Sequence, residues 1–587
     1  MKQRSPSRLL LLVLLALLGA CGLEGGAVQP TPPPAVPTPT QAPTADPKNQ
    51  GWIVGLTEEP LDLYPYSYAA RTASALLELL YPAPLQIVNE AYTTTGVLER
   101  VPSFENGDVA YVNTSAYLDP TGAITQTKTD VITSVRQLTV TYRWNKNLRW
   151  SDGTPLTAQD SVFAYNLLKG SASTPQIAIQ SDLTADYVTI DDHTTKAYLP
   201  PLRDEPNYLE TVWIPLPRHK FAEDTTAQAV NDTLARQPLG YGLYRLEAWI
   251  EGRELNFIRS DTALDPAIPA KLTVRLYPDL STLRDDVLSS RVDVAWTEQM
   301  PDTIAASLQA DTRAKTLQSW MIPTPIWEHI DMNLAVVALQ DIRMRHALAY
   351  GFDRAGLSTS IYGADQAVWD SWIAPTSWAY GGTAISRYTY DPDKARGLLD
   401  EMGYTDTDGD GLRENPAGAL FALKLVTSEQ TALREIISDR FIANMADIGL
   451  RIELETVPTQ DLYSQQGPLF QRRFELALFG WLRALDPDGA VLWSCAAIPN
   501  QVNNFTGDNF TGWCIDTADQ AIRTATGSLD QTVRKNAYIE HQQIFTRELP
   551  ILPVITRQMT VLARPSIQGL QPETFAPPTW NIQHWQR

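Results

Sequence analysis

Between residues 420 and 480, short apolar runs alternate with amphipathic stretches of helical period. In chain order the pattern predicts a strand at 421–426, a helix at 431–448, a strand at 451–457, a short helix near 459–466 and a strand at 474–479. Gly449 suits the end of the long helix, because glycine readily adopts the left-handed conformation found there. Strands that are connected through helices form parallel sheets covered on both faces. The predicted fold class is therefore α/β.

The first part of the chain shows other patterns. A strand is expected at 50–56, and residues 138–144 alternate apolar with polar side chains, as antiparallel strands and hairpins do. After Trp150 a helix is expected, with Thr157 as its N-cap and Asp160 near the positive end of the helix dipole. The chain has 587 residues, of which 44% are hydrophobic. This length is too great for one core, so two or three domains are expected.

The chain is acidic, with 47 basic and 67 acidic residues and a net charge of −20. A negative surface repels the phosphate backbone of nucleic acids. We therefore expect no nucleic-acid partner, and we infer no ligand from the net charge.

Residues 1–20 have the layout of a signal peptide. Basic residues precede an apolar run at 9–18, which is too short to span a membrane. The run Leu-Gly-Ala-Cys that ends at Cys21 resembles the cleavage site of a bacterial lipoprotein, so lipidation is expected at Cys21. An ordinary secretory signal beside an unrelated cysteine is the alternative.

Residues 21–50 are expected to form a tether. Eight prolines lie among threonine, alanine and glutamine, and there is little apolar surface to bury. Such a composition favours an extended, largely unstructured segment. With a lipid on Cys21, the globular part would be anchored to the cell membrane on its extracytoplasmic side, in the periplasm or at the outer face.

Motifs of the common enzyme classes are missing from the sequence. It has no G-x-S-x-G nucleophile elbow, no P-loop and no H-E-x-x-H zinc motif, and no two of its six histidines have the spacing of metal ligands. We predict that the protein is not an enzyme and has no catalytic residue, no metal and no cofactor. A pair of acidic side chains that meets in space, as in a glycosidase, would leave no such motif.

The run Asp-Thr-Asp-Gly-Asp-Gly at 406–411 copies the first half of a calcium-binding loop. The twelfth position of that loop is Ala417 instead of a bidentate glutamate, and Glu414 comes too early. A solvated turn is therefore predicted, with calcium binding as the alternative.

Cys495 and Cys514 are the other two cysteines, 19 residues apart. Outside the cytoplasm, where disulfides form and persist, we expect them to be bonded and to close the loop rich in asparagine and glycine between them. Two buried free thiols are the alternative.

Five segments, in this order, resemble the bacterial extracellular solute-binding proteins, family 5, which include the oligopeptide and dipeptide binders of ABC importers. They are LRWSDGTPLTAQDSV at 148–162, PLGYGLY at 238–244, DIRMRHALAYGFDR at 341–354, YDPDKARGLL at 390–399 and ELPILP at 548–553. The resemblance covers essentially all of 51–587. It implies a two-lobed periplasmic-binding-protein fold of type II, in the large peptide-binder class, with an extra subdomain in lobe one.

The resemblance also implies how the chain is divided. The expected parts are a signal peptide at 1–20, a tether at 21–50, lobe one at 51–320 with its subdomain near 91–215, lobe two at 321–545 and a return to lobe one at 546–587. The chain would cross between the lobes near 321–335 and again near 546–556. Lobes of this kind close on a ligand that contacts both of them.

The same resemblance implies a ligand cleft near the end of the strand at 474–479. Trp481, after Gly480, matches a position that lines the cleft in the family. Peptide binders place an aspartate shortly after it, whereas this chain has Arg483 there, and Asp486 either takes that role or caps the helix after it. Tryptophans of the second lobe suit a cleft that tolerates varied side chains. The expected ligand-binding residues are Trp481, Gly480, Arg483, Asp486, Trp372 and Trp493.

The expected function is that of the substrate-binding lipoprotein of an ABC importer, which binds a short peptide or similar polar solute. Its expected partners are the solute, the permease and ATPase subunits, and the membrane through the lipid; the protein itself is expected to be a monomer. A sugar, an opine or a metal chelate remains open as cargo. A secreted lipid-anchored hydrolase, and a sensor or chaperone on the same fold, are the alternatives.

Overall fold

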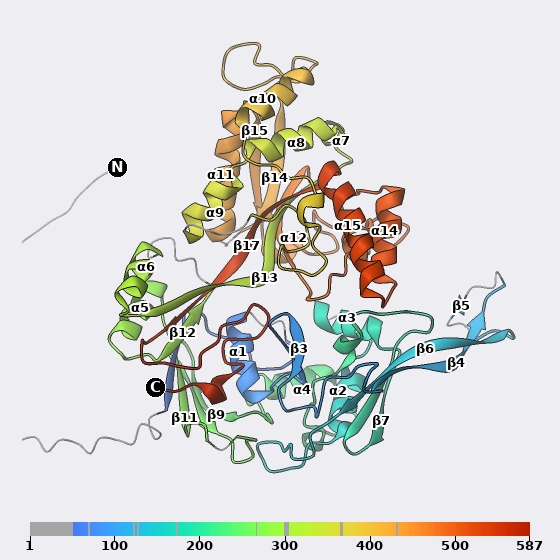
Figure 1. Ribbon diagram of the computed structural model, residues 1–587, viewed down its shortest axis with the longest axis vertical. Coiled ribbons are helices and arrows are strands. Elements are labelled where there is room, and N and C mark those ends of the chain that lie inside the picture. Colours follow the sequence, from blue (N-terminus) through green and yellow to red (C-terminus); the bar gives the residue numbers. More distant parts are fainter. Residues whose placement is uncertain are drawn as a thin grey trace, which may run out of the picture. The chain divides into compact units, whose positions relative to one another are not determined.

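The computed structural model describes residues 51–67, 71–120, 124–125, 128–171, 174–265, 267–298, 305–363, 368–429 and 432–587 (Figure 1). The predicted signal peptide, Cys21 and the tether lie outside the described residues. Within the described ranges, every helix is too short or too polar to cross a membrane.

The largest sheet has ten strands among the described residues. From edge to edge they are β15 (Arg451–Val457), β14 (Ala422–Ser428), β16 (Leu476–Leu482), β13 (Gln318–Met332), β17 (Ile551–Ala563), β12 (Val294–Thr297), β1 (Trp52–Leu56), β11 (Lys271–Leu276), β10 (Glu254–Arg259) and β9 (Tyr244–Ile250). β14 is parallel to β15 and β16, and β1 is parallel to β11 and β12. Two parallel groups are thus joined through the antiparallel pair β13 and β17.

The strands β13 and β17 belong to both parts of the sheet, and they run side by side in Figure 1. Residues 326–332 of β13 pair with β16, while residues 560–563 of β17 pair with β12. Their side chains divide in the same way: Met559 and Val561 lie in the core of the first part, whereas Leu552 and Val554 lie in the core of the second. The mixed α/β, two-lobed fold class predicted from the sequence is confirmed.

The predicted lobe boundaries stay predictions. The position 320/321 falls inside β13, and 545/546 falls inside the helix α15 (Gln531–Glu548). The contacts between Cα atoms group residues 47–587 into one compact unit. At 320/321 the chain therefore continues as one strand, whereas residues 549 and 550 separate α15 from β17.

The elements expected between 420 and 480 are present. The strands β14, β15 and β16 are separated by α11 (Ala432–Asp447) and α12 (Thr459–Leu462), as predicted. The second helix is shorter than the expected 459–466, because the chain turns tightly at Gly467, where a Cβ would lie 2.0 Å from the carbonyl oxygen of Asp461. Only glycine permits such an approach of two backbone segments.

The remaining helices lie on both sides of this sheet and between its parts. In the first part they are α1 (Arg71–Leu80), α4 (Ala227–Leu234), α5 (Leu280–Leu288) and α6 (Ala305–Ala314). In the second part they are α7 (Val337–Gln340), α8 (Ile342–Gly351), α9 (Arg354–Tyr362), α10 (Pro392–Glu401), α13 (Ala490–Trp493) and α14 (Asp516–Thr526), with α15. Asp391 is the N-cap of α10, since its side chain accepts a hydrogen bond from the backbone N–H of Lys394 at 3.0 Å.

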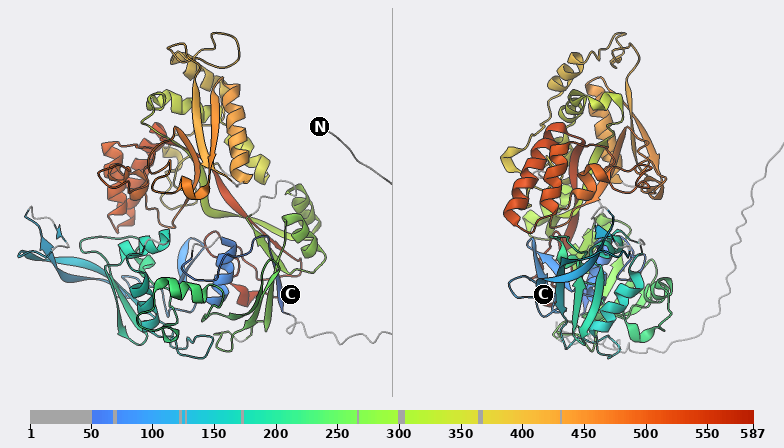
Figure 2. Two further views of the ribbon diagram at one scale, coloured as in Figure 1. Left: turned by 180° about the vertical axis from the view of Figure 1, so that it is seen from behind. Right: turned by 90° about the vertical axis from the view of Figure 1, so that its right-hand side faces the viewer.

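A second, five-stranded sheet lies in the region where the subdomain was expected. Its order is β5 (Ile124–Thr125), β4 (Val109–Leu118), β6 (Ile132–Arg143), β8 (Thr194–Tyr198) and β7 (Asp186–Asp191), and a separate hairpin joins β2 (Leu85–Val88) to β3 (Ala91–Thr94). Helices α2 (Ala158–Leu168) and α3 (Pro175–Leu183) accompany it, and β4 and β6 continue as a two-stranded ribbon (Figure 2). Thr157 is the N-cap of α2, as predicted, and its backbone N–H donates to Asp160.

Candidate functional site

Trp481 lies near the end of β16, opposite Trp327 of β13. Its ring stacks on Phe510, with 5.7 Å between centroids and 14° between planes, and on His329 at 6.0 Å. The side chain is half-buried. Neither of the two cavities described below includes Trp481 in its lining. Its role as an aromatic wall for the ligand stays a prediction.

Gly480, beside it, gives room to a buried ion network. A Cβ at this position would lie 2.9 Å from a carboxylate oxygen of Glu328 on β13, which is fully buried. Glu328 accepts hydrogen bonds from Arg434 of α11 at 3.0 Å and from Arg557 of β17 at 2.7 Å. Burial alone would raise the pKa of Glu328, but the two guanidinium groups outweigh burial and hold the pKa below its usual range. Glycine at position 480 thus leaves room for the carboxylate of Glu328. A ligand contact at Gly480 stays a prediction.

Arg483 follows β16 and lines a cavity of about 160 Å³. The cavity is bounded by residues from both parts of the chain: Glu90, Pro323, Thr324, Trp369, Ala374, Pro375, Thr376, Arg483, Ile555, Thr556, Gln558 and Thr574. The guanidinium lies over the ring of Phe575, 4.6 Å from its centroid, and the backbone N–H donates to the carbonyl of Pro325. Burial lowers the pKa of Arg483, and the nearby Glu90 opposes this.

Buried polar atoms of Arg483 and Thr556, which both line this cavity, have no hydrogen-bond partner among the described residues. They are the Nε of Arg483 and the hydroxyl of Thr556. Buried donors are nearly always paired in folded proteins. Both atoms are almost fully covered, so they are unpaired donors beside the cavity rather than part of its open surface.

A larger cavity, of about 460 Å³, is lined by one segment from the first part of the chain and by three from the second. The lining residues are Pro201, Leu202, Arg203, Asp204, Glu205, Pro206 and Asn207 on one side, and Pro487, Asp488, Ala490, Val491, Thr526, Gly527 and Arg534 on the other. Arg203 is held by Glu205 at 2.9 Å and by Asp182 at 2.6 Å. The cavity is therefore polar and carries charges of both signs.

Carboxyl groups from the two segments influence one another near the larger cavity. Burial raises the pKa values of Glu205 and Asp488. The charge of Asp488 raises the pKa of Glu205 further, and the charge of Asp486 raises that of Asp488, whereas Arg203 lowers both. The pKa of Glu210, in the short 3-10 turn Tyr208–Thr211, is raised to about 7, first by burial and then by the charges of Glu205, Asp488 and Asp486. Four carboxyl groups from two separate segments are thus gathered here.

The carboxylate of Asp486 forms an ion pair within the protein. Arg534 of α15 donates to both of its oxygens, with 2.7 Å for one of the two bonds. The alternative that Asp486 caps the following helix is wrong, because α13 begins at Ala490 and it is Asp488 that accepts from the backbone N–H of Ala490, at 3.2 Å. A ligand contact of Asp486 stays a prediction, and it would compete with Arg534.

Trp372 and Trp493 lie in an aromatic core, with 5% and 2% of their surfaces exposed. The indole N–H of Trp372 donates to Nδ1 of His541 at 3.3 Å. Burial lowers the pKa of His541 to about 3, so its ring is neutral and can accept this bond. Neither tryptophan lines the two cavities described above. Their assignment as ligand-binding residues stays a prediction.

The predicted disulfide is confirmed: Cys495 and Cys514 are bonded, with 4.9 Å between their Cα atoms. The bond closes the loop that follows α13 and precedes α14. The backbone N–H of Cys495 donates to Asp519 of α14 at 2.7 Å, which holds the same loop from a second side.

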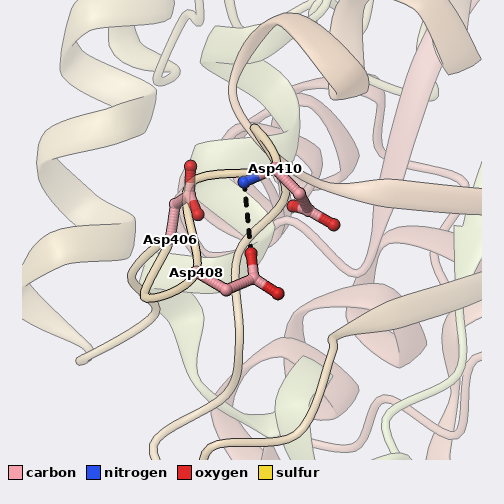
Figure 3. A group of neighbouring side chains, drawn as sticks. All are labelled: Asp406, Asp408 and Asp410. Atoms are coloured by element: carbon pink, nitrogen blue, oxygen red, sulfur yellow. Dashed lines mark hydrogen bonds between the residues drawn. The ribbon is translucent and has the colours of Figure 1, made fainter.

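The aspartates of the 406–411 loop gather at its tip (Figure 3). Carboxylate oxygens of Asp406, Asp408 and Asp410 lie within 4.8 Å of one another, and all three side chains are exposed. Both oxygens of Asp406 accept backbone N–H groups of the loop, and Glu414 accepts from Thr407 instead of facing the three aspartates. The backbone N–H groups thus partly neutralise the charge of Asp406, as a bound cation would. The solvated turn stays a prediction.

Several residues of these cavities were not expected from the sequence. Thr556 and Arg534 sit on a strand and a helix without any local signal, and only the fold brings them to the cavities. The segment around Arg203 does carry a signal, since Arg-Asp-Glu stands between prolines at 201 and 206. Prolines around a charged run indicate a fixed, extended loop.

The comparisons with known proteins agree with this architecture. Residues 129–501 match the family model "Bacterial extracellular solute-binding proteins, family 5 Middle". The peptide transport periplasmic protein SapA of Salmonella typhimurium is 28% identical over 375 residues, which are 62% of this chain and 62% of SapA. The match therefore spans less than two thirds of that relative's length.

Solved structures share the fold at low sequence identity. The oligopeptide-binding protein AppA from Bacillus subtilis, in complex with a nonapeptide, superposes with a TM-score of 0.66 and 18% identity over 91% of this chain and 98% of AppA. NikA from Brucella suis, in complex with Fe(III)-EDTA, superposes with a TM-score of 0.70 and 16% identity over 90% of this chain and 99% of NikA. The family model covers more than half of the chain, and the chain therefore belongs to the bacterial extracellular solute-binding proteins, family 5.

Proposed function

We propose that this chain is the substrate-binding component of an ABC importer, which captures a short peptide or a similar polar solute and delivers it to a permease. The observation that carries the proposal is the position of residues 483–488. Arg483 lines the small cavity, and Pro487 and Asp488 line the large one. Each cavity is completed by residues from the other part of the chain, so a solute held there would contact both lobes.

The chemistry of the cavities suits a polar solute. The large cavity combines the carboxyl groups of Glu205 and Asp488 with the guanidinium of Arg534, and the small cavity offers Arg483. A peptide carries an ammonium, a carboxylate and amide groups that such a lining can pair. The described relatives and neighbours are named for peptides or were solved with a peptide or a metal chelate. The fold supports cargo of this polarity without choosing among its members.

Delivery to a permease requires two states of the binding protein. Lobes that close on a ligand present a different surface from open lobes, and a ligand that contacts both lobes stabilises the closed state. In this chain the change of angle would be taken up by β13 and β17, which form the continuous connection between the lobes.

Binding is tested first by native mass spectrometry of the purified protein, which detects retained cargo. Calorimetry with mixtures of di- to pentapeptides, and with their N-acetylated forms, then measures affinity and the need for a free ammonium. We expect heat of binding and recovery of every peptide intact, because the protein transports its solute without changing it. Absence of retained cargo together with no heat for any peptide contradicts the peptide proposal, and cleavage of a peptide contradicts the transport proposal.

The proposal includes an extracytoplasmic location with a lipid anchor on Cys21. The family name and the periplasmic relatives support the location, and the signal-like residues 1–20 support the anchor. Intact-mass analysis of membrane fractions is expected to show loss of residues 1–20 and a diacylglyceryl adduct, and Cys21→Ser is expected to release the protein from the membrane. An unmodified Cys21 in a soluble fraction would contradict the anchor.

A further inference from the structure

We propose that the small cavity is a subsite for a carboxylate of the solute, held by the guanidinium of Arg483 with the hydroxyl of Thr556. This inference rests on the proposed function, because it names a chemical class for the solute. It does not depend on the solute being a peptide.

The first argument is the set of groups around Arg483. Its guanidinium contacts the face of Phe575 at 4.6 Å, and no ion pair or hydrogen bond of its Nε is found among the described residues. Three other arginines of the second part of the chain differ, since Arg557 and Arg434 share Glu328, and Arg534 holds Asp486. Among the described residues, Arg483 thus forms no ion pair of this kind, although the nearby Glu90 influences its pKa.

The second argument is the presence of two unpaired groups beside this cavity. Arg483 reaches the cavity from the end of β16, while Thr556 reaches it from β17, so two separate elements supply donors to one space. A guanidinium and a hydroxyl beside one cavity suit a carboxylate, which has two oxygens and accepts several hydrogen bonds. Charge-assisted bonds of this kind are stronger than those between neutral groups.

The third argument is the fit of the cavity. A volume of about 160 Å³ is small compared with a ligand pocket for a whole solute, so it suits one end or one side chain of a larger molecule. Trp369 and Ile555 form apolar parts of the lining, which would contact the carbon atoms next to the carboxylate. Glu90 is the one acidic side chain of the lining, and it is exposed to solvent, which weakens its attraction for Arg483.

The test compares matched probes that differ only in a carboxylate. Ala-Glu-Ala against Ala-Gln-Ala reports an acidic side chain, and Ala-Ala-Ala against its C-terminal amide reports the terminal carboxylate. Glutarate against glutaramide reports a free dicarboxylate that is not a peptide. Affinities are measured by calorimetry, and melting temperatures are recorded for the same mixtures.

The variants are chosen to separate charge from folding. Arg483→Met removes the charge and keeps an unbranched apolar side chain, Arg483→Lys keeps a charge, and Thr556→Val removes the hydroxyl. Arg253→Met, at an exposed turn, controls for the loss of one positive charge. The ligand-free melting temperature of Arg483→Met is expected to be at least that of the wild type, because a buried cation without an anion is removed.

We expect the carboxylate member of at least one pair to bind about tenfold or more tightly than its amide in the wild type, and this ratio to fall toward one in Arg483→Met but not in Arg253→Met. Thr556→Val and Arg483→Lys are expected to reduce the ratio in part. The pair that shows the effect identifies the source of the carboxylate.

The inference fails separately from the proposed function. If peptides bind but the ratio is the same in the wild type and in Arg483→Met, peptide capture stands and the carboxylate subsite is wrong. If no peptide binds, the glutarate pair decides: a rise in melting temperature with glutarate and not glutaramide, lost in Arg483→Met, supports the subsite, and no such difference overturns it.

Discussion

Glu210 shows how the fold changes the chemistry of a single residue. Its carboxyl group is placed near Glu205, Asp486 and Asp488, and its pKa is raised to about 7. Between the ordinary value of 4.5 and this value, the folded protein binds the proton of Glu210 more tightly than the unfolded chain does. The group therefore lowers stability as the pH rises through this window, and its full cost is present above it.

Replacing Glu210 with glutamine removes this cost. We expect Glu210→Gln to be more stable than the wild type above pH 7, by up to about 3 kcal/mol, with the difference shrinking to about zero near pH 4.5. Urea unfolding between about pH 4.5 and about pH 8 measures the difference. Glu251→Gln, at an exposed turn, controls for the loss of one negative charge. A difference that is constant across this range would show that the carboxyl groups do not influence Glu210.

Sequence reasoning found part of the site at this scale and missed the rest for a physical reason. Arg483 was expected because it stands in a stretch of the chain that is recognisable by its motif. Glu210 and Thr556 carry no local pattern, and their unusual surroundings arise from segments far apart in the chain. Trp372 was expected in the cleft because tryptophans suit a site that tolerates varied side chains, and the structure buries it against His541.

At the scale of elements, β13, β17 and α11 are tied together by Glu328. Its carboxylate is fully buried and is shared by Arg434 and Arg557, so one acid holds two cations on two other elements. Removing the acid leaves both guanidinium groups without their anion in the interior. The cost of such a change exceeds that of an exposed ion pair several times over.

We expect Glu328→Gln to lower the free energy of unfolding by about 3–5 kcal/mol at neutral pH. Because the folded pKa is depressed, the contribution of Glu328 is present above the ordinary pKa and is lost as the pH falls through the folded pKa. Chemical denaturation measures the loss. Glu455→Gln, on the exposed side of β15, is expected to change stability by less than about 0.5 kcal/mol. Equal effects of the two variants would disprove the network's role.

The disulfide Cys495–Cys514 ties α13 to α14 across the intervening loop. We expect Cys495→Ser combined with Cys514→Ser to lower the free energy of unfolding by about 3 kcal/mol, since the loop between them regains its freedom in the unfolded chain. Reduction of the wild type is expected to give the same loss and to leave the double variant unchanged. A wild type that is unaffected by reduction would show that the bond contributes nothing to stability.

The fold was most predictable where the sequence repeats one element pattern. The strands β14, β15 and β16 were expected because each is a short apolar run between helices, and α2 was expected from its cap. The lengths of β13 and β17 were not predicted. Their side chains contribute first to one core and then to the other, so the sequence shows no single period along these strands. The helix α12 was predicted too long, because the backbone contact at Gly467 is not visible in hydrophobicity.

At the scale of the whole molecule, both cavities are built from segments of two lobes. A solute that binds there is expected to favour the closed arrangement, and the radius of gyration is expected to fall on binding. Small-angle X-ray scattering, with and without a peptide that gives heat in calorimetry, measures the change. An unchanged scattering curve at saturating peptide would mean that binding does not require closure.

The pairing of β13 with β17 has a further consequence for how such a chain can be assembled. Asp331 and Ile551 are opposite one another in the sheet, although more than two hundred residues of chain separate them. The segment between them is therefore an inserted domain, which is connected to the rest of the chain through the single strand pair β13 and β17. Exchanging this inserted domain between relatives requires rejoining the chain only at this strand pair. We expect such chimaeras to keep the first core and to acquire a new half of the cleft.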